Sequence, residues 1–336
     1  MKQDTILLAH GSGGTLMHKL ISGLFASKFS NPILDKLDDS ATFELPPGRV
    51  SFSTDTYVVQ PLIFRGGNIG KLAVCGTVND VAAMGAEPIY LSCGFIIEEG
   101  LAVSELETIL DSMVASAKEA GVLIVTGDTK VVEKGGADKL FINTAGVGVV
   151  RDGVDIGAAG AKIGDKILLS GTIGDHGIAV VSEREGLRFE TAVESDCAPL
   201  NKMISSMLDV SRNVHCLRDP TRGGLASTLN EFAAASDVGL HIIEDRVPIR
   251  DEVAGACEML GYDVFHVANE GKIVAIVEPA DADAVLAAMK TSPYGADAAI
   301  IGEVVEEPKG KVLVDTHFGS TRILDMLVGE QLPRIC

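Results

Sequence analysis

The sequence predicts an α+β protein of the α/β sandwich type, folded in two domains. Stretches with apolar residues at helical spacing alternate with short β-branched runs through most of the chain, a pattern typical of sheets covered by helices. The chain has 336 residues, 46% of them hydrophobic and 22% charged, which is enough to build two hydrophobic cores. A glycine-rich segment at residues 157–164 interrupts the alternation, and we place the boundary between the domains there.

The N-terminal half is expected to begin with a strand at Ile6–Ala9, followed by a glycine cluster and a helix at Thr15–Phe29. The run Gly127-Asp128-Thr129-Lys130 is expected to form a turn at the end of a strand. The remaining predicted elements are strands at 50–55, 88–97, 122–125 and 140–150 and helices at 69–84 and 103–120. We divide this half into a glycine-rich segment with its helix at residues 1–40 and a domain at residues 41–156.

The C-terminal half repeats the alternation and forms a second α/β domain at residues 157–320. Strands are predicted at 166–169, 239–243, 264–267, 273–277, 298–305 and 311–314, and helices at 177–185, 199–210, 225–235, 250–260 and 280–289. Residues 321–336 have neither pattern, and we expect them to form a mobile tail.

Composition and charge exclude several classes of protein. A net charge of −19, with no Trp and only four Tyr, argues against a nucleic-acid-binding surface. No apolar run approaches the roughly 20 residues of a membrane helix, and the N-terminal apolar run is too short for a signal peptide, so we expect a cytoplasmic protein. None of the six cysteines form a C-x-x-C pair, which argues against a zinc knuckle and suits a reducing compartment.

Acidic residues recur at the ends of predicted elements. They are Asp38 with Asp39, Asp55, Asp80, Asp128 and Asp219. Hard oxygen ligands of this kind suit Mg²⁺ that bridges to phosphates, but each of them alone is more typical of a helix cap or a turn. Asp80 is the most informative, because a carboxylate among the apolar residues of a predicted helix is costly to bury without a partner.

Two further stretches have a plain and a functional interpretation. The cluster His10-Gly11-Ser12-Gly13-Gly14 before a helix could present backbone N–H groups to an anion, or it could be a flexible hinge. The last residue, Cys336, could be an idle thiol or a carrier thiol on an arm that Pro333 stiffens. A thiol on such an arm in water should have an ordinary pKa.

Four motifs occur in an order that resembles a known ATP-binding superfamily, that of aminoimidazole ribonucleotide synthetase, selenophosphate synthetase and thiamine-monophosphate kinase. They are Thr54-Asp55-Thr56, Val78-Asn79-Asp80-Val81-Ala82-Ala83-Met84-Gly85-Ala86, Gly127-Asp128-Thr129-Lys130 and Asp219-Pro220-Thr221-Arg222-Gly223-Gly224. With the His10–Gly14 cluster and the terminal Pro333-Arg334-Ile335-Cys336, nearly the whole chain resembles the HypE family of hydrogenase maturation proteins. Selenophosphate synthetases carry a reactive cysteine or selenocysteine near their N-terminal glycine loop. In this chain that region contains Ser12 and no thiol, which argues against selenium chemistry.

The resemblance implies a two-domain PurM-like fold whose N-terminal domain binds ATP and forms the interface of a homodimer. It also implies a lyase, a carbamoyl dehydratase, that receives a carbamoyl group on Cys336 from the carbamoyltransferase HypF. ATP and Mg²⁺ would serve to dehydrate this group to a thiocyanate. The HypC–HypD complex would then accept the cyanide as a ligand for [NiFe] hydrogenase iron.

The resemblance also implies roles for individual residues. Asp38, Asp55, Asp80 and Asp219 match the acids that bind Mg²⁺, and Cys336 matches the carrier. His10, Gly11, Gly13 and Gly14 are expected to close over the phosphates, with Asp128 and Thr129 holding nucleotide or metal. Lys130 is expected to stabilise charge on the transferred phosphoryl group, and Glu270 to act as the base that deprotonates the carbamoyl nitrogen. On sequence alone, Glu270 could equally be a solvated acid in a turn.

Two rival functions remain at this stage. One is an ATP-dependent synthetase of a small molecule, in which Cys336 is incidental and its replacement leaves activity unchanged. The other is a non-catalytic scaffold that binds nucleotide without turning it over and uses the tail to dock partners.

Overall fold

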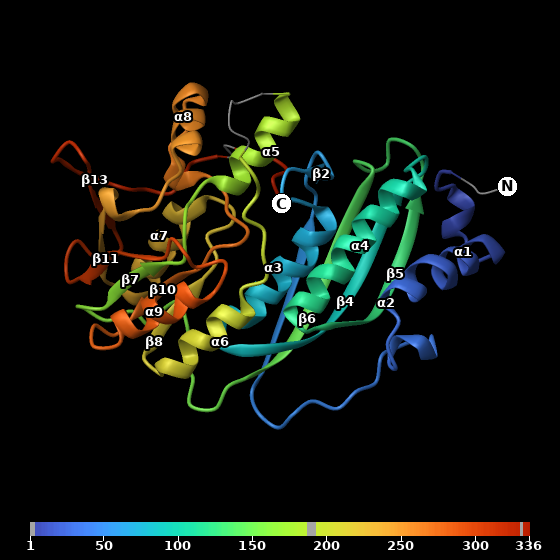
Figure 1. Cartoon of the computed structure of the whole chain (residues 1–336), viewed down its shortest axis with the longest axis horizontal. Coiled ribbons are helices and arrows are strands. Elements are labelled where there is room, and N and C mark those ends of the chain that lie inside the picture. The colour runs from blue at the N-terminus through green and yellow to red at the C-terminus, as the bar shows by residue number, and fades with distance from the viewer. Residues whose placement is uncertain (1–3, 187–192, 330–331) are drawn as a thin grey trace.

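The computed structural model describes residues 4–186, 193–329 and 332–336 of the chain. The N-terminal half contains the strands β1 (Val50–Tyr57), β4 (Ala86–Glu98), β5 (Leu123–Val132) and β6 (Leu140–Val150), and a short hairpin of β2 (Ile63–Phe64) and β3 (Gly67–Asn68). The four long strands form one sheet in the order β1-β6-β4-β5 (Figure 1). β4 and β5 pair in parallel, and the other neighbours pair antiparallel.

Two helices, α3 (Ile69–Ala83) and α4 (Val103–Ala120), cover one face of this sheet (Figure 1). α3 begins after Asn68, whose Oδ1 accepts hydrogen bonds from the backbone N–H groups of Gly70 and Lys71 at 2.9 and 3.1 Å. Every residue of α3 except Lys71 and Asp80 is buried, because the helix lies between the sheet and the C-terminal half. α3 therefore carries Asp80 into the region between the two halves.

The predicted helix at Thr15–Phe29 is confirmed as one helical run beside β5. It consists of α1 (Thr15–Leu20), the π-helical η2 (Ile21–Ala26) and α2 (Ser27–Phe29), and two 3₁₀ turns, η1 (Leu8–Gly11) and η3 (Leu34–Lys36), flank it. The ring of Phe25 lies 4.8 Å from the ring of Phe95, centroid to centroid, and anchors the run against β4.

The C-terminal half is a sheet with helices on both faces, which confirms the sandwich type. Its strands are β7 (Lys166–Leu169), β8 (Val214–Arg218), β9 (Gly239–Ile243), β10 (Val274–Val277), β11 (Ala299–Val305), β12 (Val312–Asp315) and β13 (Thr321–Ile323), in the order β13-β12-β9-β11-β7-β10-β8. Its helices are α5 (Asp175–Glu185), α6 (Asn201–Val210), α7 (Gly224–Ser236), α8 (Asp251–Leu260) and α9 (Ala282–Thr291), with 3₁₀ turns η4 (Glu244–Arg246) and η5 (Val264–His266). Along β7, Ile167 and Leu169 pack in the core under α7, whereas Leu168 packs with α6 and α9.

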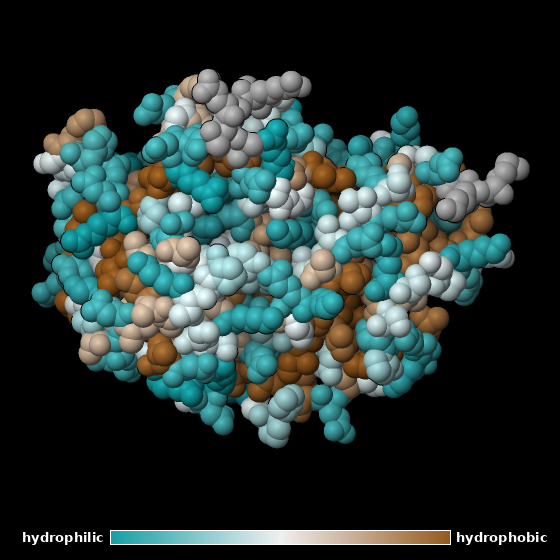
Figure 2. Space-filling model, in the orientation of Figure 1, coloured by the Kyte–Doolittle hydropathy of each residue, from teal (hydrophilic) through white to brown (hydrophobic). Residues whose placement is uncertain are grey.

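The second face of the N-terminal sheet carries exposed apolar side chains. Along β1, Ser53, Asp55 and Tyr57 point toward α3, whereas Phe52 points away and is 71% exposed. Val50 and Ile96 are also exposed. Figure 2 shows the molecule from the side of α3 and α4, where teal hydrophilic side chains separate smaller brown groups. Within the described residues, no helix has the length and apolar character needed to cross a membrane.

Two predicted strands are wrong, and in both cases a polar side chain bends the chain. Ile6–Ala9 forms no strand: an isolated bridge joins the preceding Thr5 to Ala102, and η1 begins at Leu8, where Nδ1 of His10 accepts a hydrogen bond from Leu7 N–H at 2.9 Å. Residues 264–267 form η5 rather than a strand, because the Asp263 carboxylate accepts a hydrogen bond from Phe265 N–H at 3.1 Å.

The structure differs from the predictions at three further places. β5 continues through Gly127–Lys130, where a turn was expected, since these residues pair with β4 from Cys93 to Ile96. β8 was not predicted at all. The expected tail at residues 321–336 begins too early, because Thr321–Ile323 pairs with β12 as an edge strand. Residues 332–336 dock against both halves, and Leu332 and Ile335 are buried.

Candidate functional site

Three of the predicted acids converge between the two halves. Asp55 lies on β1, Asp80 on α3, and Asp219 directly after β8, and Ser53 Oγ donates a hydrogen bond to Asp80 Oδ2 at 2.8 Å. Burial raises the pKa of Asp80, and the charge of Asp55 raises it further, while the bond from Ser53 lowers it. Burial, followed by the charge of Asp80, raises the pKa of Asp219 to about 7. Carboxylates that raise one another's pKa values in this way form a ready site for a cation.

Glu270 lies beside these acids in the same interior region. Its side chain is 2% exposed, and its Oε1 has no hydrogen-bond partner among the described residues. Burial raises the pKa of Glu270 well above its ordinary value, with further contributions from Asp219, Asp196 and Asp55. The interpretation of Glu270 as a solvated turn acid is therefore wrong, because the residue is an unpaired interior carboxyl group.

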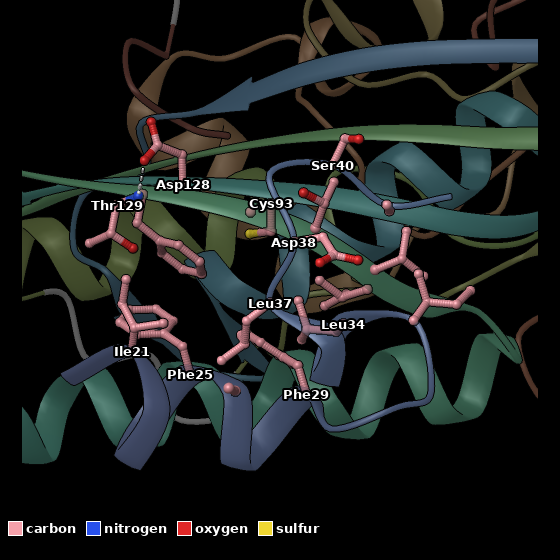
Figure 3. A pocket seen from close by; sticks show the side chains of 18 of the residues that line it. Ile21, Phe25, Phe29, Leu34, Leu37, Asp38, Ser40, Cys93, Asp128 and Thr129 are labelled. Atoms are coloured by element: carbon pink, nitrogen blue, oxygen red, sulfur yellow. Dashed lines mark hydrogen bonds between the residues drawn. The ribbon is translucent and has the colours of Figure 1, made fainter. Parts of the chain in front are cut away.

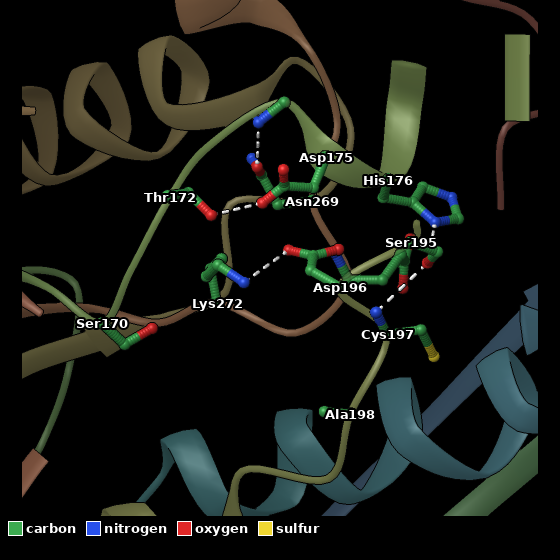
Figure 4. Close-up of polar contacts among 12 residues, drawn as sticks. Ser170, Thr172, Asp175, His176, Ser195, Asp196, Cys197, Ala198, Asn269 and Lys272 are labelled. Atoms are coloured by element: carbon green, nitrogen blue, oxygen red, sulfur yellow. Dashed lines mark hydrogen bonds and ion pairs between the residues drawn. The ribbon is translucent and has the colours of Figure 1, made fainter. Parts of the chain in front are cut away.

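A buried polar network supports the segment that carries Glu270 (Figure 4). Glu270 N–H donates to Asp196 Oδ1 at 3.1 Å, and Asp196 Oδ2 pairs with Lys272 Nζ at 3.2 Å. Although burial alone would raise the pKa of Asp196, the charge of Lys272 and further favourable contacts hold it below its ordinary value. From the other side, Asn79 Nδ2 donates to Glu270 O at 3.3 Å, which links this segment to α3. Glu270 is thus fixed from both halves of the molecule.

Cys336 docks at the same place. Its carbonyl oxygen accepts a hydrogen bond from Val58 N–H at 3.0 Å, directly after β1, and the preceding Ile335 is buried. The Cys336 side chain is partly buried. Burial and the nearby charge of Glu270 raise the pKa of the docked Cys336 thiol well above its ordinary value, whereas the expectation of an ordinary pKa concerned a tail in water.

The other predicted residues gather at β5 (Figure 3). Asp128 and Lys130 form an exposed ion pair at 2.9 Å, and Asp128 Oδ1 also accepts from Thr129 N–H at 2.8 Å. The hydrogen bond from Lys130 lowers the pKa of Asp128. Gly11 packs so closely on β5 that a Cβ there would lie 2.8 Å from Val131 N, which brings the start of the glycine cluster to the same strand.

A pocket of about 300 Å³ opens beside Asp128 and Thr129, between the helical run and the sheet (Figure 3). Its apolar lining comes largely from that run and the segment after it, and includes Phe25, Phe29, Leu34 and Leu37. Asp38 and Ser40 also line this pocket. Sequence reasoning missed the pocket, although apolar residues that follow Asn31-Pro32 outside any predicted element were an available signal.

The two groups of residues lie at opposite edges of the N-terminal sheet. Asp55 pairs with Thr144, Thr144 with Cys93, and Cys93 with Gly127, next to Asp128. Three strand spacings of about 4.8 Å separate the edge strands by roughly 14 Å. The structure therefore does not bring Asp38 to the other three acids. The described residues contain no group of three or more His, Cys, Asp or Glu that could hold a metal ion by themselves.

Replacing Asp219 by asparagine is expected to stabilise the nucleotide-free protein above pH 7. The folded-state pKa of about 7 lies above the unfolded value near 3.8, so unfolding releases a proton between these pH values and stability falls as pH rises. The asparagine side chain cannot ionise, which removes a loss on the order of a few kcal/mol. Thermal melting from pH 4 to 8 should therefore show a flatter profile for Asp219→Asn than for the wild type.

The exposed Asp152 provides the control for this experiment. Asp152→Asn should follow the wild-type melting profile at every pH. An Asp219→Asn variant with the wild-type pH dependence would contradict the assignment of a raised pKa to Asp219.

Comparisons with known proteins show similarity in sequence and in fold over nearly the whole chain. Residues 37–150 match the family model of the N-terminal domain of AIR synthase related proteins, and residues 162–315 match that of their C-terminal domain. The chain is 56% identical over 337 residues to carbamoyl dehydratase HypE of Bradyrhizobium diazoefficiens, covering 100% of this chain and 97% of that protein.

Two solved structures are similar over most of their length. A crystal structure of hydrogenase maturation protein HypE in complex with ATP has a TM-score of 0.96 and 49% identity, covering 99% of this chain and 100% of that chain. A crystal structure of a HypE–HypF complex contains a chain with a TM-score of 0.81 and 48% identity, covering 92% of this chain and 99% of that chain.

Proposed function

The chain belongs to the HypE family of carbamoyl dehydratases, which act in hydrogenase maturation, and from this premise we propose that it dehydrates an S-carbamoyl group on its own Cys336 to a thiocyanate with the use of ATP. The observation that carries the proposal is the docked position of Cys336. Cys336 lies near Glu270, an unpaired interior carboxyl group, and within the electrostatic influence of Asp55 and Asp219. An incidental terminal cysteine would need no such site.

The chemistry explains why a nucleotide and a base are both needed. A carboxamide oxygen is a poor leaving group, so the carbonyl oxygen of the carbamoyl group attacks the γ-phosphorus of ATP and ADP leaves. The C–O bond then breaks, phosphate departs with the bonding electrons, and the nitrogen gives up two protons as the C≡N bond forms. The net change is loss of one water from the carbamoyl group and cleavage of ATP to ADP and phosphate.

Glu270 is placed to take a proton from the nitrogen. Its raised pKa makes its carboxylate a stronger base than an exposed glutamate, and its free Oε1 has no competing donor among the described residues. Besides burial, the charges of Asp219, Asp196 and Asp55 contribute to this raised pKa. Compensation of Asp55, Asp80 and Asp219 by a cation would therefore also prepare Glu270 as a base.

These three acids would hold Mg²⁺ together with phosphate oxygens of the nucleotide, since the pKa values of Asp80 and Asp219 stay raised although Arg218 and Arg222 partly compensate them. The acids form no metal site by themselves within the described residues. Mg²⁺ would neutralise charge on the phosphates of ATP during phosphoryl transfer. Asp38 does not fit this set within one chain, because it lines the pocket at β5.

We place the adenine ring in the apolar pocket between the helical run and β5. Gly13 and Gly14, which have open space around their Cα atoms, would then offer backbone N–H groups to the phosphates. Lys130 is exposed and pairs with Asp128, which lines this pocket. Its ammonium group could therefore stabilise the negative charge that develops on the transferred phosphoryl group.

Within one chain, the nucleotide pocket and the three acids lie at opposite edges of the sheet. In a homodimer, the pocket of one chain could lie beside the acids of its partner. The exposed apolar face of the sheet, with Val50, Phe52 and Ile96, is a natural interface. We propose that pairing of two chains through this face brings β5 of one chain to Asp80 and Cys336 of its partner. Each catalytic site would then contain residues of both chains.

Mixing two inactive variants tests this arrangement. Dimers of Asp80→Asn and dimers of Lys130→Ala should each fail to dehydrate the carbamoyl group. A mixed dimer, in contrast, contains one site with both native residues. Random re-pairing makes half of the dimers mixed, with one intact site of two, so about a quarter of wild-type activity should return. The readout is ATP-dependent water loss from carbamoylated Cys336, measured after the dimers are dissociated and re-formed. Sites built within single chains would give no recovery.

The partners follow from the same geometry. The thiol of docked Cys336 has a raised pKa and is a poor nucleophile, so the carbamoyl group is accepted when the tail is released. A relative is seen in a HypE–HypF complex, and we propose HypF as the carbamoyl donor and HypC–HypD as the cyanide acceptor. We place the reaction in the cytoplasm, where six free cysteines remain reduced.

A further inference from the structure

Most hydrogen bonds of the docked tail are made by its backbone, while the Arg334 side chain pairs with Asp138 and the side chains of Leu332 and Ile335 are buried. Each of its last four carbonyl groups accepts a hydrogen bond from the rest of the chain. Arg184 donates to Pro333 O at 2.8 Å and to Arg334 O at 2.7 Å, and His176 Nε2 lies 2.7 Å from Ile335 O. Backbone N–H groups of Gln60 and Val58 donate to Arg334 O and Cys336 O at 3.2 and 3.0 Å.

Arg184 connects three segments through one guanidinium group. Besides the two tail carbonyls, its Nε donates to Gln60 O at 2.8 Å, so the tail is fixed to the segment after β1 as well as to α5. Arg334 has a φ of 51°, a conformation that residues other than glycine rarely adopt, and both adjacent carbonyls face the guanidinium. The planar fork of arginine suits this geometry, whereas a lysine ammonium could not reach all three acceptors at once.

The protonation of His176 is fixed by its second contact. Nδ1 lies 2.8 Å from Ser195 Oγ, and Ser195 Oγ accepts a hydrogen bond from Cys197 N–H at 3.1 Å (Figure 4). The hydroxyl hydrogen of Ser195 is thus free to point at Nδ1, which leaves the ring proton on Nε2 to donate to Ile335 O. Burial lowers the pKa of His176, so the neutral ring persists at physiological pH.

We propose that Arg184 and His176 of α5 form the tail receptor and act as positioning residues that hold the tail by its carbonyl groups, whatever group the Cys336 sulfur carries. None of the hydrogen bonds involves Sγ. The free thiol, the carbamoylated form and the cyanated form can therefore dock in the same place. This inference rests on the proposed function for its role in the reaction cycle, but the docking itself is independent of it.

The tail receptor sets the balance between two steps that need opposite tail positions. Water loss needs the docked tail, whereas loading by a donor enzyme needs the released tail. Weakening the receptor should therefore speed loading and slow water loss. A residue needed only for folding would slow both steps.

Alkylation of Cys336 measures docking without a donor enzyme or ATP. Full-length Arg184→Ala protein, free of nucleotide, is treated with iodoacetamide, and the Cys336 peptide is followed by mass spectrometry. The other five cysteines are at most 4% exposed, so the signal comes from the tail. Loss of a charged donor shared by two tail carbonyls should raise the alkylation rate about tenfold. Arg184→Lys should show an intermediate increase, because it keeps the charge with fewer simultaneous bonds.

Arg65→Ala is the matched control. Arg65 is an exposed arginine beside α5 that approaches Glu183 at 4.0 Å, and none of its side-chain contacts involves the described tail residues. It should alkylate at the wild-type rate, and all variants should melt near the wild-type temperature.

The outcomes separate the receptor from the proposed function. Unchanged Cys336 alkylation in a folded Arg184→Ala protein would overturn the tail receptor even if the wild type dehydrates carbamoylated Cys336. Faster alkylation in a protein whose wild type shows no carbamoyl chemistry would support the receptor and remove the proposed function. Faster alkylation with faster loading and slower water loss would support both.

Discussion

Replacing Cys336 by alanine is expected to abolish carbamoyl loading and water loss completely. The proposed reaction is a covalent relay, and the alanine side chain has no atom that can accept the carbamoyl group. ATP binding should persist, because none of the residues that line the pocket beside β5 belongs to the tail. The measurement is transfer of a labelled carbamoyl group from the donor enzyme, together with ATP affinity.

Cys257→Ala is the control for this substitution. Cys257 is buried on α8, at 4% exposure, and should be replaceable with full retention of loading. Retained ATP turnover on a small-molecule substrate in Cys336→Ala would instead favour the rival synthetase. A protein that binds ATP but never cleaves it would favour the scaffold.

Changing Glu270 to glutamine is expected to slow water loss by about 10²–10⁴-fold, the usual contribution of a general base. Glutamine keeps the size of the side chain and cannot ionise in a site where burial disfavours the charged carboxylate, so the fold should survive. Loading of Cys336 should be unaffected, because the donor enzyme performs that step. Single-turnover water loss from pre-carbamoylated protein separates the two effects.

The pH profile sharpens this test. Because burial raises the pKa of Glu270, water loss in the wild type should rise with pH as the carboxyl group ionises, and the glutamine variant should lose that rise. Glu278→Gln, a change just after β10, should behave as the wild type. Wild-type rates and pH dependence in Glu270→Gln would mean that another group removes the proton.

Much of the fold could be predicted from residue patterns. α4 and β6 have the predicted bounds, since Gly121 ends the helix in a left-handed conformation and alternating apolar residues define the strand. The failures arise where a side chain competes with backbone pairing, as His10 does with Leu7 N–H and Asp263 with Phe265 N–H. Such local bonds leave no periodic signal.

The candidate site was predictable in its residues but not in its arrangement. Motif resemblance singled out Asp55, Asp80, Asp219 and Glu270, and the structure gathers these four. Asp38 and Asp128 were assigned to the same centre, but strand order places them at the far edge of the sheet. Which strand lies beside which is decided by tertiary packing, and a motif in one strand does not record it.

The docked position of the tail could not be predicted from the sequence. Its hydrogen bonds to α5 use carbonyl groups, which every residue has, so no residue type in Pro333–Cys336 predicts them. In the sequence, Arg184 likewise resembles any charged residue near the end of a helix. Only the folded structure shows that its three N–H groups point at three carbonyl groups.

The most direct test of the proposed reaction is the mass of the Cys336 peptide during one cycle. The full-length protein is incubated with the carbamoyl-donating enzyme and its substrate, first without and then with Mg-ATP. We predict a carbamoyl adduct on Cys336 that is stable without ATP and loses one water only as ATP is cleaved to ADP and phosphate. An unmodified Cys336, with the donor enzyme shown to be active, or an adduct that keeps its water while ATP is consumed, would contradict the proposed reaction.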